Sequence, residues 1–267
     1  MTDALEQLKQ GDPEGALRAL QAEVRANPAD AKRRVFLFQL LCVLGQWDRA
    51  LSQLNVAGEL DAGTLGMVQV YREALASEAL RAEVFAGRRS PLIFGEPEQW
   101  MAVLLEALRV GAGGETDQSQ SLREQAFEQA PASGGMLDGQ RFEWIADADP
   151  RLGPMLEAVV NGRYYWVPLH RIAEIRFEKP VDLRDLVWLP VELKWANGGE
   201  AVGLVPTRYP GSEQASDPAL KLGRKTEWLD AGAGTFVGCG QRMLATDADE
   251  FSLMEMRSIV LDAAPAE

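Results

Sequence analysis

Residue types that commonly carry out enzyme chemistry are scarce in this sequence. His170 is the single histidine, and the two cysteines, Cys42 and Cys239, lie far apart in the chain. This inventory cannot supply a zinc site at the usual ligand spacing. No nucleophile-elbow motif accompanies His170, so the pattern does not indicate a Ser-His-Asp triad. We therefore expect a solvated or hydrogen-bonded structural histidine, and no catalytic residues, metal site or cofactor.

The segment 238–242, Gly-Cys-Gly-Gln-Arg, permits two interpretations. Arg242 could lower the pKa of Cys239, which a reactive thiol requires. The two glycines could instead form a tight turn or a β-bulge. The segment lacks Gly-Lys-Ser/Thr and a following helix, so it is not a phosphate-binding P-loop. We expect Cys42, which lies beside an apolar helix face, to be a small buried hydrophobic residue.

Two carboxylates, Asp147 and Asp149, are separated by one alanine and precede Pro150. Such a pair can contribute to a hard-cation site, but the remaining ligands and the glycine of a calcium loop are missing. Capping of a turn by Asp149 is the favoured interpretation.

The aromatic residues of this sequence can serve either in core packing or in binding a partner. Five of the seven tryptophans fall in the C-terminal part: Trp144, Trp166, Trp188, Trp195 and Trp228. A β-rich core can absorb most of them, and exposed ones would anchor a protein partner together with arginines. The densest run, 162–168 (Gly-Arg-Tyr-Tyr-Trp-Val-Pro), is expected to be a strand that leaves Arg163 and one tyrosine at the surface. The residues that we predict to contact a partner are Trp100, Arg163, Tyr164, Arg208 and Tyr209.

The net charge of −13 argues against partners that carry phosphate groups. Nucleic acids and anionic membrane surfaces both require basic patches. The acidic N-terminus has no basic region followed by an apolar run, and no apolar run is long enough to span a membrane. With two isolated cysteines, a reducing, cytoplasmic location is expected.

The first 60 residues contain an internal repeat. Gly11, Ala16, Leu17 and Leu20 recur as Gly45, Ala50, Leu51 and Leu54, each at an offset of 34. This is the tetratricopeptide period, in which a small alanine lets two helices approach closely. Plain helical hairpins are the alternative. Apolar periodicity and breakers predict helices near 3–10, 13–26, 29–44, 47–57, 64–87, 97–110 and 117–130.

From residue 141 the apolar period changes to two. The cleanest run is Val187, Leu189, Val191, Leu193 and Trp195, which a turn at Asn197-Gly198 connects to a strand at 201–205. A short helix is predicted at 152–160. The expected fold class is α+β, with an N-terminal all-α tetratricopeptide-like domain (1–130), a linker (131–140) and a small, mainly antiparallel, barrel-like β domain with one short helix (141–267).

Several long motifs resemble one protein family. They include FEWIADADPRLGP at 142–154, NGRYYWVP at 161–168, LRDLVW at 183–188 and PTRYPGSE at 206–213, with further matches at 88–100 and 222–228. Together they are similar to the ImpE/SciE/TagJ family of accessory proteins of the bacterial type VI secretion system.

The resemblance implies a cytoplasmic, non-enzymatic adaptor that acts with the contractile sheath. The implied partner is the small sheath subunit (TssB or VipA), bound through a helix near its N-terminus. The implied role is to modulate sheath assembly or recycling. Tetratricopeptide-like helices can offer a groove to such a helix, and we expect an apolar groove in the helical part or at its junction with the β part.

Two alternatives from other functional classes remain. A cysteine-dependent enzyme would require Cys239 to be exposed with a depressed thiol pKa. A self-associating structural module would require a large apolar interface between identical copies.

Overall fold

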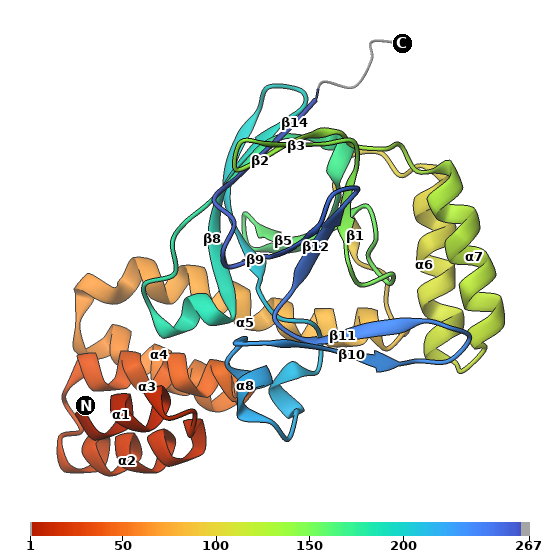
Figure 1. The fold of residues 1–267 in the computed structure, drawn as a ribbon. Helices are drawn as coiled ribbons and strands as arrows, with labels where there is room; N and C mark the ends of the chain where they lie inside the picture. The colour runs from red at the N-terminus through yellow and green to blue at the C-terminus, as the bar shows by residue number, and fades with distance from the viewer. Residues whose placement is uncertain (1, 263–267) are drawn as a thin grey trace.

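The computed structural model describes residues 2–262 and places a group of helices before a β-rich part (Figure 1). The helices are α1 (Thr2–Lys9), α2 (Pro13–Ala26), α3 (Ala31–Val43), α4 (Trp47–Leu60), α5 (Leu65–Phe85), α6 (Gln99–Ala112) and α7 (Thr116–Gln129). Each corresponds to a helix predicted from apolar periodicity, with ends displaced by a few residues.

The repeated segments form two successive helical hairpins, α1–α2 and α3–α4. Ala16 and Ala50, at equivalent positions of the repeat, are both fully buried. The turn before α2 is stabilised by Asp12, whose Oδ1 accepts a hydrogen bond from the Gly15 amide at 2.7 Å. Gly11 and Gly45 end the first helix of each hairpin with φ of 81° and 65°, a conformation that favours glycine.

The β-rich part consists mainly of one sheet in the order β1-β6-β5-β9-β8-β7-β14-β2-β3. Its strands are β1 (Leu92–Ile93), β2 (Gly135–Leu137), β3 (Gln140–Phe142), β5 (Met155–Val160), β6 (Arg163–Pro168), β7 (Ile172–Phe177), β8 (Trp188–Trp195), β9 (Glu200–Pro206) and β14 (Ser258–Leu261). All neighbours pair antiparallel except β1 and β6. Figure 1 shows the sheet curled into a barrel-like shape, as predicted.

Two smaller sheets complete this part. One contains β13 (Glu250–Ser252), β12 (Met243–Thr246) and β4 (Ile145–Asp147), and the other is a ribbon of β10 (Thr226–Asp230) and β11 (Phe236–Gly240). Short helical turns connect the strands: η1 (Ala62–Thr64), η2 (Leu169–Arg171), η3 (Leu183–Leu186), η4 (Ser212–Gln214) and α8 (Pro218–Lys221).

The helix predicted at 152–160 is wrong, because this segment forms β5. All six residues of β5 are buried. Met155 and Val159 face the core shared with the helices, whereas Leu156, Ala158 and Val160 face the interior of the sheet. A strand buried on both faces loses the alternation that identifies strands, so its apolar run resembles a buried helix.

The segment 131–140, predicted as a linker, contains β2, which pairs with β14 and β3. The predicted frayed tail at 263–267 lies outside the described residues.

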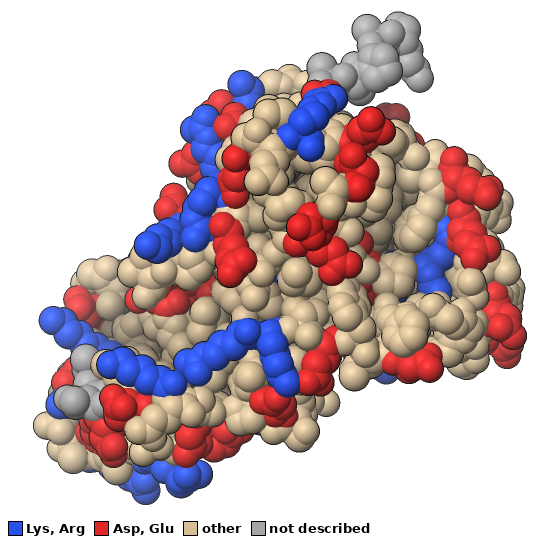
Figure 2. Space-filling view, in the orientation of Figure 1, with Lys and Arg blue, Asp and Glu red and all other residues tan. Residues whose placement is uncertain are grey.

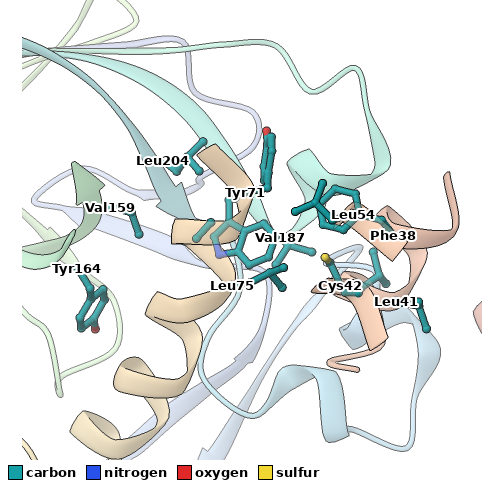
Figure 3. Packing of buried hydrophobic residues seen from close by; sticks show 14 of the residues in the cluster. Phe38, Leu41, Cys42, Leu54, Tyr71, Leu75, Val159, Tyr164, Val187 and Leu204 are labelled. Carbon is teal, nitrogen blue, oxygen red and sulfur yellow. The ribbon is translucent and has the colours of Figure 1, made fainter. Parts of the chain in front are cut away.

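One hydrophobic core runs through both parts of the protein. Figure 3 shows Phe38, Cys42 and Leu54 of the helical hairpins close to Tyr71 and Leu75 of α5 and to Val187 beside β8. Val159, Tyr164 and Leu204 of the sheet belong to the same cluster. A second core, inside the curled sheet, includes Phe142, Val167, Leu189 and Ile259. Because the first core is shared, we expect the helices and the sheet to unfold together.

Candidate partner-binding surface

The face that the helices α3, α4 and α5 turn toward the sheet is covered by the protein's own β part. The Trp188 ring centroid lies 5.9 Å from that of Trp47 and 6.0 Å from that of Tyr71. The Trp188 Nε1–H donates to Glu78 Oε1 at 2.8 Å. Arg208 Nη1 donates to the Val43 carbonyl oxygen at the end of α3 at 2.8 Å. A partner helix would have to displace these contacts to use this face.

Buried charged residues hold the helices against the sheet. We call this set the junction cluster: Glu78, Arg81, Asp147, Asp149, Glu157, Arg208 and Arg242, each at most 9% exposed. Arg81 of α5 donates to both carboxylate oxygens of Glu157 on β5, at 2.7 and 3.1 Å, and to the Arg208 carbonyl oxygen at 2.7 Å. Arg242 and the Tyr164 hydroxyl also donate to Glu157. These three donors, two guanidinium groups and one hydroxyl, stabilise the negative charge of the Glu157 carboxylate, which would otherwise be costly to bury.

Burial shifts the pKa values within the junction cluster. Burial raises the pKa of Asp147 to about 7, although Arg242, with Nε 3.3 Å from Asp147 Oδ2, opposes the shift. Burial likewise lowers the pKa of Arg242 to about 10. Both shifts share one cause, the loss of water around a charge.

The shift at Asp147 predicts a pH-dependent contribution to stability. Between about pH 4 and pH 7 Asp147 stays protonated in the folded protein but ionises in the unfolded chain. The folded state then binds more protons, so this contribution is full below pH 4 and is lost as pH rises through 7. We expect Asp147→Asn to remove a slope of up to about 1.4 kcal/mol per pH unit from the free energy of unfolding.

Urea denaturation at a series of pH values measures this slope. Asp48→Asn, at an exposed position on α4, is the matched control for the substitution itself. An unchanged slope in Asp147→Asn would show that Asp147 ionises normally in the folded protein.

Four of the five residues predicted to contact a partner are buried. Trp100, Tyr164, Arg208 and Tyr209 are at most 4% exposed, and only Arg163 is exposed. The Trp100 Nε1–H donates to Glu98 Oε2 at 2.9 Å, and the Tyr209 hydroxyl donates to Asp147 Oδ1 at 3.2 Å. Partner contact by these residues stays a prediction that would require the four to become exposed.

The side chains considered as candidates for chemistry are buried or hydrogen-bonded to neighbouring groups. Cys239 is 8% exposed, and burial raises the pKa of its thiol, the opposite of what a reactive cysteine needs. His170 Nε2 lies 3.0 Å from Glu98 Oε1, and burial lowers the pKa of this histidine. The Arg151 amide donates to Asp149 Oδ1 at 2.9 Å, which is the predicted turn capping. Across residues 2–262, no three metal-ligating side chains come together.

An apolar groove lies where α7 meets the β part. It measures about 460 Å³, and its lining includes Phe127, Ala130, Pro131, Trp144, Pro150 and Pro154. Trp144 is 41% exposed and Phe127 is 38% exposed. Phe127 packs over Gly153, where a Cβ atom would stand 2.4 Å from Phe127 Cε1 and where φ is +52°. A glycine at 153 therefore allows α7 to approach the turn before β5 closely.

Exposed acidic residues are close in sequence to residues that line the groove. Glu124 and Glu128 are exposed one helical turn apart on α7, and Glu143 precedes Trp144. Asp247 accepts a hydrogen bond from the Glu143 amide at 2.7 Å. Figure 2 shows acidic side chains along the outer edge of the molecule over α7. An apolar groove with exposed acidic residues nearby in the sequence suits an amphipathic segment that also carries basic residues. Within residues 2–262 no helix is both long and apolar enough to cross a lipid bilayer.

Comparison with known proteins identifies the family. The sequence is 52% identical over 264 residues to the type VI secretion system accessory component TagJ of Pseudomonas aeruginosa, covering 99% of this chain and 92% of that protein. The chain belongs to the ImpE/TagJ family of type VI secretion accessory proteins. The ImpE family model matches residues 139–260, and a tetratricopeptide repeat model matches residues 7–66.

The family fold has a crystallographic counterpart. The structure of protein VPA1032 from Vibrio parahaemolyticus superposes with a TM-score of 0.87 and covers 98% of each chain, at 24% sequence identity. This likeness supports the fold of the ImpE/TagJ chain, in which a tetratricopeptide-like helical region precedes a mainly antiparallel sheet.

Proposed function

We propose that this protein is a cytoplasmic, non-enzymatic adaptor of the type VI secretion system. It binds the N-terminal helix of the small contractile-sheath subunit (TssB- or VipA-like) and modulates sheath assembly or recycling. Its membership of the ImpE/TagJ family supports the accessory role. The observation that carries the binding proposal is the open apolar groove between α7 and β4, with Trp144 and Phe127 exposed inside it.

The groove suits a single amphipathic helix. A helix presents apolar residues at i, i+3, i+4 and i+7 on one face, and these would cover Trp144 and Phe127. Basic residues beside that face would meet Glu124, Glu128 and Glu143. By contrast, the inner face of α3–α5 is covered by Trp188 and the η3 turn. We therefore place the partner at the junction of the two parts and not among the helical hairpins.

A calorimetric titration tests the proposal. A synthetic peptide of the small sheath subunit's N-terminal helix, from the same bacterium, is titrated into the full-length protein. We expect saturable binding with a Kd on the order of micromolar, and weaker binding at higher salt if Glu124, Glu128 and Glu143 contribute to it. The control peptide has its apolar face replaced by serine. Absence of binding at high micromolar concentrations would contradict the proposal.

A further inference from the structure

A second surface, separate from the groove, lies along the β10–β11 ribbon. The ribbon is two-stranded, and β10 pairs only with β11 within the part of the chain that is described (Figure 1). Hydrogen bonds close both of its ends: the Ala231 amide donates to the Thr235 carbonyl oxygen at 2.8 Å, and the Gln241 amide donates to the Lys225 carbonyl oxygen at 2.9 Å. Because β11 occupies one long edge of β10, the other long edge is available for pairing.

The register identifies which backbone groups face that edge. Residues 225 and 231 bond to β11, and in an antiparallel ladder bonded and non-bonded positions alternate. Thr226, Trp228 and Asp230 therefore direct their backbone N–H and C=O groups away from β11. The opposite strand agrees, because the Gly238 amide, across from Trp228, donates outward to Asp149 Oδ2 at 2.8 Å.

The edge is held in place before any partner arrives. The Gly240 amide donates to Ser212 Oγ at 2.7 Å, and the Tyr209 amide donates to the Gly240 carbonyl oxygen at 2.9 Å. The Tyr209 ring packs directly under Gly238, where a Cβ atom would lie 2.2 Å from it. A strand that is already ordered binds an added strand at a lower entropic cost.

The side chains along β10 have an ordered pattern of charge. Trp228 is 37% exposed and Leu229 is 49% exposed, and they are flanked by the exposed carboxylates Glu227 and Asp230. Lys225 Nζ lies 2.6 Å from both Glu227 and Asp217, so one cation is shared by two anions. Asp230 adds a third carboxylate, and the exposed Arg224 precedes this segment. Figure 2 shows separate acidic patches in the region of the ribbon and a band of Lys and Arg side chains that reaches its left end. The short length of β10 and its charged side chains disfavour unspecific pairing, so a partner strand needs complementary charges.

We propose that β10 accepts an extended segment of another protein as an added strand. The segment carries two adjacent apolar residues with a basic residue on each side. This order follows from direct cross-strand pairing: basic residues lie opposite Glu227 and Asp230, and apolar residues lie opposite Trp228 and Leu229. The same order serves a parallel or an antiparallel strand because it reads identically in both directions.

In the register centred on Trp228, a second copy of this chain fits the edge less well. Pairing two β10 strands antiparallel about Trp228 places Glu227 opposite Leu229 and Asp230 opposite Thr226, so neither carboxylate meets a cation. Each chain also has a net charge of −13, which opposes association.

The test uses a short, end-blocked peptide in which two adjacent valines are flanked by lysines, titrated calorimetrically into the full-length protein. We expect saturable binding. Exchanging the order, so that valines flank two lysines, should weaken binding about tenfold. Methylating the peptide amides that face β10 should abolish binding to the unaltered protein, because it removes the donors of the ladder. Equal binding of the methylated peptide, or no saturable binding up to millimolar concentration, would overturn the proposal.

Two variants distinguish the contribution of the Trp228 backbone N–H to binding from that of the Trp228 side chain. Trp228→Ala should weaken binding severalfold, whereas Trp228→Pro should abolish it, because the Trp228 N–H faces the free edge and not β11. Thermal unfolding checks that both variants fold. Trp144→Ala should bind this peptide normally, so failure here is distinguishable from failure of the groove proposal. If the wild-type protein sediments as a dimer that Trp228→Pro dissociates, the edge belongs to a second copy and the proposal is wrong.

Discussion

Replacing Glu157 by glutamine is expected to lower the free energy of unfolding by about 3–5 kcal/mol. Glu157 is fully buried and is the shared acceptor for Arg81 and Arg242. Glutamine keeps the size of the side chain but removes the charge, so two buried guanidinium groups lose their common counter-ion. For a chain of this size the loss corresponds to a decrease in Tm of roughly 10 °C.

The matched control is Glu83→Gln, which removes an exposed carboxylate that pairs with Arg88 at 2.7 Å. An exposed pair contributes little, so this variant should unfold almost as the wild type does. Chemical denaturation, followed by circular dichroism and by tryptophan fluorescence, measures the free energy of unfolding of the two variants. Because α5 and β5 share the junction cluster, the wild type should unfold in one transition. Equal midpoints for the two variants would show that the junction cluster does not hold the parts together.

Trp144→Ala is expected to weaken binding of the sheath-subunit helix about thirtyfold or more. Tryptophans that a partner covers near the centre of an interface commonly contribute 2 kcal/mol or more, and 1.4 kcal/mol corresponds to a factor of ten. Trp144 is partly exposed in the free protein, so its removal should leave the fold intact. Titration of the helix peptide into the variant measures the change.

Trp228→Ala provides a matched control for this prediction. Trp228 has a similar exposure, 37%, but lies on the β10–β11 ribbon. It should bind the sheath-subunit helix with wild-type affinity. If Trp228→Ala loses the helix and Trp144→Ala retains it, the ribbon and not the groove is the helix site.

Much of the helical part could be predicted because its determinants are local. Asp12 and Pro13 mark the start of α2, and Gly11 and Gly45 mark helix ends, in a pattern repeated after 34 residues. Strand β8 was equally predictable, since its buried and exposed residues alternate. Strand β5 was not, because it lies between two cores and its sequence is apolar at almost every position.

The partner-binding residues and the groove could not be predicted in the same way, because they depend on contacts between residues distant in sequence. Tyr164 and Arg208 have the residue types of interface anchors, but the same types are used in buried polar clusters. What buries them is a set of partners far along the chain, such as Arg81 for the Arg208 carbonyl. The groove likewise forms only when α7 packs over Gly153, so no local pattern could join Phe127 to Trp144.

The central claim is that the sheath-subunit helix binds at the junction of α7 and the β part. The crystal structure of the full-length protein with that helix peptide tests it most directly. The account predicts that the helix covers Trp144 and Phe127 and places basic residues beside Glu124 and Glu128. A helix bound instead to the helical hairpins α1–α4, with Trp144 still exposed, would contradict it.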